Sequence, residues 1–362
     1  MKQTVKFWEA NLKLLLFAGL ILILPIFWLR GYGDFYARQP QYWLWLSGII
    51  LFFALSQRNF WLRCFLAYCL CLSLYYDFIV GHIQELENGT KVIVRDFTVN
   101  SLISLMTLCV AIWAVSFVQK LNKEYLKVVI VYSAYIVFYF WIFKNFENRW
   151  IAGAYLAFCL PLILTCTKKL WLNILASIIP FIGILMTNSA MAIISAYVGV
   201  IIIFLAKKNY KILGVFCLAS FIIAFFYLPK DFAKFPFRQE VWRKSFFSKA
   251  EQEKRTLSDY MLGTGLRSFA GYGIMEGADV LCTHAHNEYL EVLAEQGIIG
   301  LILIIGFIIE LFLVKAPIEY KAGLAAICTH AGGYYACRLA MTGLVIIVYL
   351  GILEGYRKGD EG

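Results

Sequence analysis

The chain has 362 residues, of which 61% are hydrophobic and only 15% are charged, whereas an ordinary soluble domain carries about 25% charged residues. A soluble protein could not hide this much apolar surface, so the composition excludes a soluble globular enzyme, a disordered chain and a disulfide-stapled secreted module. The net charge of +10 is explained by basic loops that face anionic lipid, and no nucleic-acid partner is expected.

The predicted fold is an all-α polytopic membrane protein with about twelve transmembrane helices. Each apolar segment is near the ~20 residues that cross a bilayer. The first apolar run, from Leu14 to Leu29, follows three lysines and is interpreted as an uncleaved span, because it is long and no small-residue cleavage site follows it. The segments cover residues 11–29, 41–57, 61–80, 97–119, 126–144, 151–167, 171–187, 189–206, 212–228, 297–314, 322–339 and 340–355.

The distribution of basic residues predicts the orientation. With the N-terminus inside, seventeen Lys and Arg fall in inner segments and seven in short outer loops. This excess predicts that both termini are cytoplasmic in a multi-pass protein of the bacterial inner membrane. We therefore expect a transmembrane bundle of about nine spans over residues 1–228, a periplasmic loop subdomain over 229–288, and C-terminal spans with a cytoplasmic tail over 289–362. In the outer loop after the third span, Asn88-Gly89 predicts a turn.

The end of the long outer loop carries the residues best suited to chemistry. Cys282, His284, His286 and Asn287 precede a segment with helical periodicity, in which three glutamates occupy a separate face. Asn287 is a plausible N-cap, which would set His286 at the mouth of a helix N-terminus. The free N–H groups of a helix N-terminus attract phosphate, and a neutral His there is able to accept a proton from a hydroxyl. A histidine bonded to loop backbone is the plainer alternative, and a metal site is disfavoured because no fourth ligand is spaced nearby.

Three arginines are candidates for phosphate recognition. Arg238 and Trp242 share a helical face, with Arg243 beside them, and Arg149 stands at the outer mouth of the sixth span. The planar guanidinium fork matches phosphate oxygens. A surface amphipathic helix at 237–243 and a snorkelling Arg149 are the alternatives. The arginines and the histidine all belong to the predicted outer face, where an anionic lipid-linked substrate would meet them.

Several motifs together resemble the O-antigen ligase and polymerase family. The most specific is His286-Asn287 followed after nine residues by Gly297-x-x-Gly300. The others are Arg238-x-x-x-Trp242, then Leu262-Gly263-Thr264-Gly265, and the run from Asn148 through Arg149-Trp150 to Pro161-Leu162. One departure stands out, because the chain reads Thr187-Asn188-Ser189-Ala190-Met191 where family members often carry a Ser-Arg element. Arg149 or Arg243 would then have to compensate for the absent arginine.

The resemblance implies a glycosyltransferase that moves a glycan from an undecaprenyl-diphosphate-linked donor to lipid A–core at the periplasmic face. It implies that His286 is the catalytic base and that Arg238 neutralises the leaving diphosphate, in an inverting transfer without a metal or other cofactor. Diphosphate or substrate binding is assigned to Arg149, Trp242, Arg243, His284 and Asn287.

Other activities remain open at this point. An O-antigen polymerase, or a transferase that modifies Ser or Thr of proteins, would use the same scaffold. A lipid-linked glycan transporter or flippase is the rival from a different class. Transporters commonly place polar groups near the bilayer midplane, whereas the informative polar residues of this chain gather in the outer loop.

Overall fold

The structure is a computed structural model that describes residues 59–80, 82–85, 91–94, 99–143, 149–215, 256–266, 287–333 and 340–360. Its helices are α4 (Phe60–Leu74), extended by the π-helix η1 (Tyr75–Val80), α5 (Val99–Val118), α6 (Lys123–Phe143), α7 (Arg149–Ile163), α8 (Leu170–Met186), α9 (Ala190–Ala206), α13 (Leu257–Leu262), α14 (Glu288–Leu313), α15 (Ile318–Ala331) and α16 (Ala340–Asp360). The fold is therefore predominantly α-helical, as predicted.

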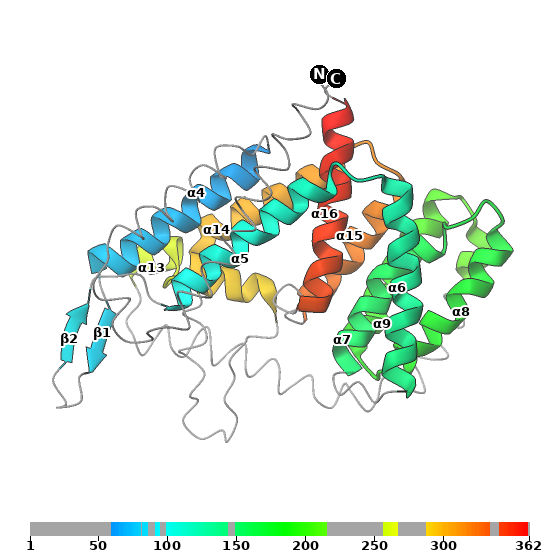
Figure 1. The fold of residues 1–362 in the computed structure, drawn as a ribbon, viewed down its shortest axis with the longest axis horizontal. Coiled ribbons are helices and arrows are strands. Elements are labelled where there is room, and N and C mark those ends of the chain that lie inside the picture. Colours follow the sequence, from blue (N-terminus) through cyan, green and yellow to red (C-terminus); the bar gives the residue numbers. More distant parts are fainter. Residues whose placement is uncertain are drawn as a thin grey trace, which may run out of the picture.

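A β-hairpin is the exception to the all-α prediction. Strands β1 (His82–Glu85) and β2 (Lys91–Val94) pair antiparallel, with His82 opposite Val94 and Glu85 opposite Lys91. The hairpin lies between η1 and α5, in the segment predicted to be an outer loop (Figure 1). Residues 86–90, which include the predicted Asn88-Gly89 turn, lie outside the described residues, but the two strands that this turn would connect are present.

The predicted apolar segments coincide with helices wherever the structure describes them. Among the described residues, α14 is long and apolar enough to cross a membrane, and the shorter helices Trp150–Ile163, Leu170–Met186 and Ala190–Ala206 are also apolar. Segments 11–29 and 41–57, and most of 212–228, lie outside the described residues, so the number of twelve spans stays a prediction. Membrane location is suggested by these helices.

The surface of α8 supports a lipid environment. Its outward residues are large and apolar, including Leu175, Ile178 and Ile179, which are 58%, 44% and 46% exposed. Its buried residues include Asn173 and Ser177. An exposed apolar face with small and polar residues packed inside is expected of a helix that contacts lipid tails.

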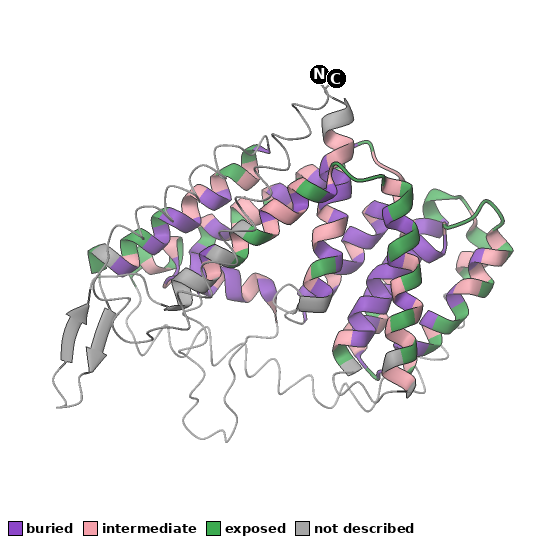
Figure 2. Ribbon diagram, viewed as in Figure 1, coloured by how far each residue is buried: buried purple, intermediate pink, exposed green. Residues whose placement is uncertain are grey.

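The core lies where α7, α9, α15 and α16 meet, and Figure 2 shows the concentration of buried residues on α7 and α9. Tyr349 on α16 is fully buried, and its hydroxyl donates a hydrogen bond to the Phe158 carbonyl at 2.6 Å. The ring of Tyr349 occupies the space where a Cβ on Gly323 of α15 would be. Close packing through small residues is typical of helix contacts in membranes.

A second group of helices, α4, α5, α13 and α14, lies beside this core (Figure 1). Phe65, Cys69, Leu70 and Leu105 form its buried centre. The ends of α4 and α16 are joined by Asn59, which caps α4 through Leu62 N–H and donates to Glu354 at 2.8 Å. Within this group α14 also contacts α15 and α16 of the core, and the predicted site lies at its N-cap, directly before its first residue.

Candidate active site

The start of α14 is built around Asn287. Its side-chain oxygen accepts a hydrogen bond from Leu290 N–H at 3.1 Å, which is the N-cap predicted from the sequence. Its side-chain nitrogen donates to the Gly332 carbonyl at 2.9 Å. One amide side chain therefore both begins α14 and ties it to the end of α15.

A second bond strengthens this tie. The Tyr289 hydroxyl donates to the Cys328 carbonyl on α15 at 2.9 Å. Because Asn287 and Tyr289 flank the first residue of α14, the two bonds fix both the position and the rotation of the helix start. The backbone next to His286 is held in consequence by two hydrogen bonds to a neighbouring helix.

The turn after α15 also contacts the segment that departs from the family pattern. A Cβ on Gly333 would overlap the Met191 side chain at the start of α9. One turn into α7, a Cβ on Gly153 would lie 2.7 Å from the Thr187 hydroxyl oxygen. The starts of α7, α9 and α14 and the ends of α8 and α15 thus meet at one end of the bundle.

This meeting point brings the first turns of α7, the helix that begins at Arg149, against the segment that lacks the family's arginine. Arg149 is the first residue of α7, and Gly153, four residues on, packs against Thr187. Thr187 is fully buried at the end of α8, where its hydroxyl donates to the Ile184 carbonyl at 2.6 Å. Thr187 therefore serves the helix end rather than a ligand, and Arg149 is the nearby arginine of the sequence motif.

The helix α14 breaks at Gly297, which has φ 66° and ψ −170°. This combination of angles is essentially restricted to glycine and costs about 1–3 kcal/mol for other residues. The break frees carbonyls of the preceding turn, and backbone N–H groups from the loop after α13 satisfy two of them. Thr264 N–H donates to Ala294 O at 3.1 Å, and Gly265 N–H donates to Glu295 O at 2.9 Å.

The two glycine motifs contact each other through their backbones. A Cβ on Gly297 would overlap the backbone of Met261 and Gly263, and a Cβ on Gly263 would overlap the backbone between Glu295 and Gln296. Gly263 has φ 80°, so it too needs a backbone that other residues rarely adopt. We call this backbone contact between residues 262–265 and 295–297 the glycine contact.

Two tyrosines, one from α4 and one from η1, stabilise the glycine contact through hydrogen bonds to its carbonyls. The Tyr68 hydroxyl lies within hydrogen-bond distance of two carbonyls. It donates to Gln296 O at 2.6 Å, and the Leu262 O is a second, more distant acceptor at 3.1 Å. The Tyr76 hydroxyl donates to Gly263 O. Neither tyrosine carried a sequence signal, since both lie in an apolar run far from the motifs. His330, fully buried against the Phe158 ring just before Gly332, was likewise not singled out.

The acidic face of α14 is buried. Glu288, Glu291 and Glu295 are 8%, 0% and 2% exposed. The periodicity separated these residues from the apolar face, which ordinarily indicates a solvent-exposed polar face. Tertiary packing overrides that pattern here, because no residue of the first part of α14, residues 288–297, is exposed, whereas Ile302 and Ile309 farther along the helix are exposed. Glu288 and Glu291 accordingly present little charge at the surface of the helix start.

The structure describes part of the predicted site. Asn287 is placed in full, and Arg149 is placed as the first residue of α7. The remaining candidates lie outside the described residues, so their roles stay predictions: Arg238, Trp242, Arg243, His284 and His286. The structure brings the motif at Gly263 against the motif at Gly297, and it brings Gly153 against Thr187 in the segment that departs from the family pattern.

Residues 175–305 match the sequence model of a family described as O-antigen ligase. The match confirms the resemblance to that family and contains the motifs from Arg238 to Gly300, whereas the segment from Asn148 to Leu162 lies before it. The family consists of membrane enzymes of the O-antigen ligase and polymerase type, which agrees with a glycosyltransferase activity. No curated protein matches the chain.

Proposed function

We propose that this chain, similar to O-antigen ligases over residues 175–305, transfers a glycan from undecaprenyl-diphosphate-linked O-antigen to lipid A–core at the periplasmic face of the bacterial inner membrane. The observation that carries the proposal is the double anchoring of α14. Asn287 and Tyr289 tie its start to α15, and the glycine contact holds its break. A catalytic base gains from a rigid support of this kind, because its geometry must be set before the reaction.

In the proposed reaction, His286 accepts the proton of the acceptor hydroxyl as its oxygen attacks the anomeric carbon of the donor sugar. The new carbon–oxygen bond forms while the bond to the diphosphate breaks, which inverts the anomeric carbon. Arg238 and Arg149 bind the diphosphate as negative charge develops on the leaving oxygen. Asn287, next to His286, contributes by keeping the helix start in place.

The remaining assigned residues act in substrate binding. Arg243 and His284 offer further donors to phosphate or sugar oxygens, and Trp242 provides an aromatic surface at the membrane interface. Arg149 supplies the positive charge that the Thr187–Met191 segment lacks relative to the family pattern. The proximity of Gly153 to Thr187 supports this compensation.

The test is a gel of lipopolysaccharide from a strain in which the gene is deleted. The strain is complemented with the wild-type gene or with the His286→Ala or Arg238→Ala variant. We expect both variants to give bare core while polymeric glycan accumulates on undecaprenyl diphosphate. Arg63→Ala, which removes an exposed arginine of α4, is the control and should restore the full ladder. Normal ladders from either site variant would contradict the assigned roles.

The same gel separates the alternative functions. If the deletion strain makes core capped with a single repeat, the chain is a polymerase rather than a ligase. If carrier-linked glycan stays on the cytoplasmic side of the membrane in the deletion strain, the chain is a flippase rather than a ligase or a polymerase. A ladder that is unaffected, together with loss of glycan from Ser or Thr of proteins, would assign the activity to protein modification.

A further inference from the structure

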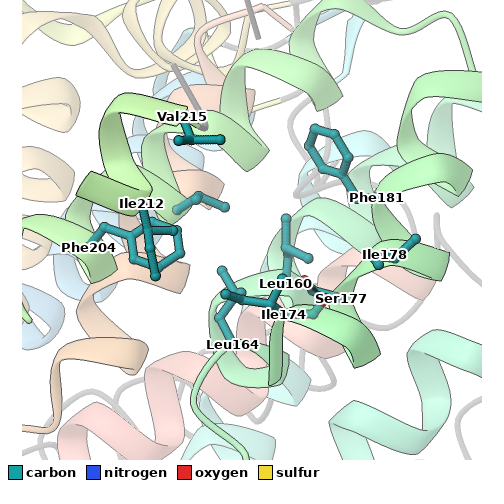
Figure 3. Close-up of a pocket in the computed structure, with 10 residues that line it drawn as sticks. Leu160, Leu164, Ile174, Ser177, Ile178, Phe181, Phe204, Ile212 and Val215 are labelled. Carbon is teal, nitrogen blue, oxygen red and sulfur yellow. Dashed lines mark hydrogen bonds between the residues drawn. The ribbon is translucent and has the colours of Figure 1, made fainter. Parts of the chain in front are cut away.

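An apolar groove of about 250 Å³ opens between α7, α8, α9 and the helical residues 210–215. Figure 3 shows its lining, which includes Leu160, Leu164, Ile178, Phe181, Phe204 and Ile212. The single polar side chain among the lining residues is Ser177, and its hydroxyl donates to the Ile174 carbonyl at 2.7 Å. The groove therefore offers hydrocarbon contacts and no free polar group from its described lining.

The groove lies at the opposite end of the bundle from the candidate active site. α7 begins at the site with Arg149 and reaches the groove at Leu160 and Leu164. α9 begins beside the site at Ala190 and reaches the groove at Phe204. In the predicted topology this end faces the cytoplasmic leaflet, so the groove is separate from the proposed transfer chemistry.

Two lysine-rich turns flank the mouth of the groove. Lys168 and Lys169 follow Leu164, and Lys207, Lys208 and Lys211 stand between Phe204 and Ile212. All five lysines are exposed, and neither turn contains an acidic residue. The rim thus concentrates positive charge directly beside a hydrocarbon-lined groove.

Exposed aromatic residues mark the same level. Trp171, at the start of α8, is 63% exposed, and Tyr210, between Lys208 and Lys211, is 62% exposed. Trp and Tyr are enriched where a membrane protein crosses the headgroup region. Their position beside the lysines places the rim at headgroup depth and the groove among the acyl chains.

The turn that carries Lys168 and Lys169 is held by hydrogen bonds from a buried side chain of α8. Asn173 is fully buried, and its side-chain nitrogen donates to Leu164 O at 3.1 Å and Thr167 O at 2.8 Å. Its oxygen accepts from Thr167 N–H at 2.9 Å. Lys208 in the second turn has φ 53°, a left-handed backbone that is uncommon for lysine. The two lysines of the first turn and the three of the second are therefore held on turns of defined backbone conformation.

We propose that this groove binds one anionic phospholipid of the cytoplasmic leaflet. An acyl chain lies along Leu160, Ile178 and Phe204, and the phosphate lies between the two lysine turns. Basic pockets between helices on the cytoplasmic side are a recognised way to hold anionic headgroups. The complementarity of charge at the rim favours a phospholipid over a neutral hydrocarbon ligand.

Native mass spectrometry of the purified full chain tests the proposal with dioleoyl-phosphatidylglycerol and dioleoyl-phosphatidylcholine as probes. We expect tighter binding of the anionic lipid. Lys168→Gln/Lys169→Gln should weaken that binding by about fivefold for each lysine removed, and it should leave phosphatidylcholine binding unchanged. Lys120→Gln/Lys315→Gln removes two exposed lysines from other turns of the same predicted side and should have no effect.

A second pair of variants tests the groove itself. Ile178→Trp fills it, whereas Ile179→Trp changes the neighbouring residue of similar exposure that does not line it. The proposal is supported if Ile178→Trp loses binding of both lipids and Ile179→Trp retains it. Equal binding of the two lipids, equal effects of the two tryptophans, or displacement of phosphatidylglycerol by polyprenyl phosphate would overturn it. Because the readout is bound lipid, the result is independent of glycan transfer.

Discussion

Asn287 and Gly332 are joined by a 2.9 Å hydrogen bond from the asparagine side chain to the glycine carbonyl, across 45 positions of sequence. The same asparagine caps α14. Its two roles use different atoms, since the oxygen caps the helix and the nitrogen reaches α15. They are therefore separable by substitution.

We predict that Asn287→Ser keeps the cap but loses the bond to Gly332, because the shorter hydroxyl does not reach it. Glycan transfer should fall in Asn287→Ser and in Asn287→Ala alike, since both leave the Tyr289 hydroxyl as the remaining described hydrogen bond between the start of α14 and α15. Only Asn287→Ala should lose the cap as well, at a cost of about 1 kcal/mol. Thermal unfolding in detergent and a lipopolysaccharide gel measure the two effects. Full transfer by Asn287→Ser would show that the bond to Gly332 is dispensable.

Gly297→Ala should disrupt the glycine contact. The added Cβ meets the backbone of Met261 and Gly263, and the backbone conformation alone costs about 1–3 kcal/mol for a residue other than glycine. We expect a lower unfolding temperature and faster proteolysis near α13. Gly214→Ala, where an added Cβ meets no atom, is the matched control and should be neutral or slightly stabilising. Equal behaviour of the two variants would refute the contact.

Tyr68→Phe removes the hydroxyl that bonds Gln296 and Leu262 while keeping the ring. We expect a loss of about 1 kcal/mol in the free energy of unfolding. Glycan transfer should also decrease, because the break in α14 is less firmly held. Tyr132→Phe changes a 67% exposed residue of α6 and serves as the control. Unchanged transfer and stability in Tyr68→Phe would remove Tyr68 from the support of the site.

Lys127 and Glu319 form a largely buried ion pair at 2.8 Å, and Lys127 also donates to Thr165 O at 2.9 Å. Glu319→Met should cost about 3 kcal/mol, because it leaves the ammonium without its carboxylate. Lys127→Met/Glu319→Met should recover most of this loss, since no uncompensated charge remains. Glu124→Met, at an exposed position, is the control. Additive losses in the double variant, measured by chemical unfolding, would contradict the pairing.

Much of the helical framework could be predicted from the sequence. A helix satisfies its backbone hydrogen bonds within one segment, so an apolar run of sufficient length predicts a helix in a membrane. The helices α5, α6, α8 and α9 lie close to the positions predicted in this way. The asparagine cap at the start of α14 could also be predicted, because capping depends on a side chain and the N–H groups three residues away. Both are local properties of the chain.

Other features depended on packing between distant segments. The periodicity of α14 separated its glutamates from its apolar face, yet Glu291 is fully buried because neighbouring elements enclose the helix. The sequence marked Gly263 and Gly297 as members of separate motifs without showing that their backbones touch. Tyr68 and Gly332 carried no signal, because hydrogen bonds to distant carbonyls leave no local pattern.

Hydropathy, capping and short motifs act over a few residues, so they were enough to predict a predominantly α-helical protein, the positions of most of its described helices and the family that it resembles. Which motifs meet depends instead on the tertiary structure. It joined the start of α14 to α15 and the break at Gly297 to the loop after α13, because these contacts depend on close approach of backbones that lie far apart in the chain.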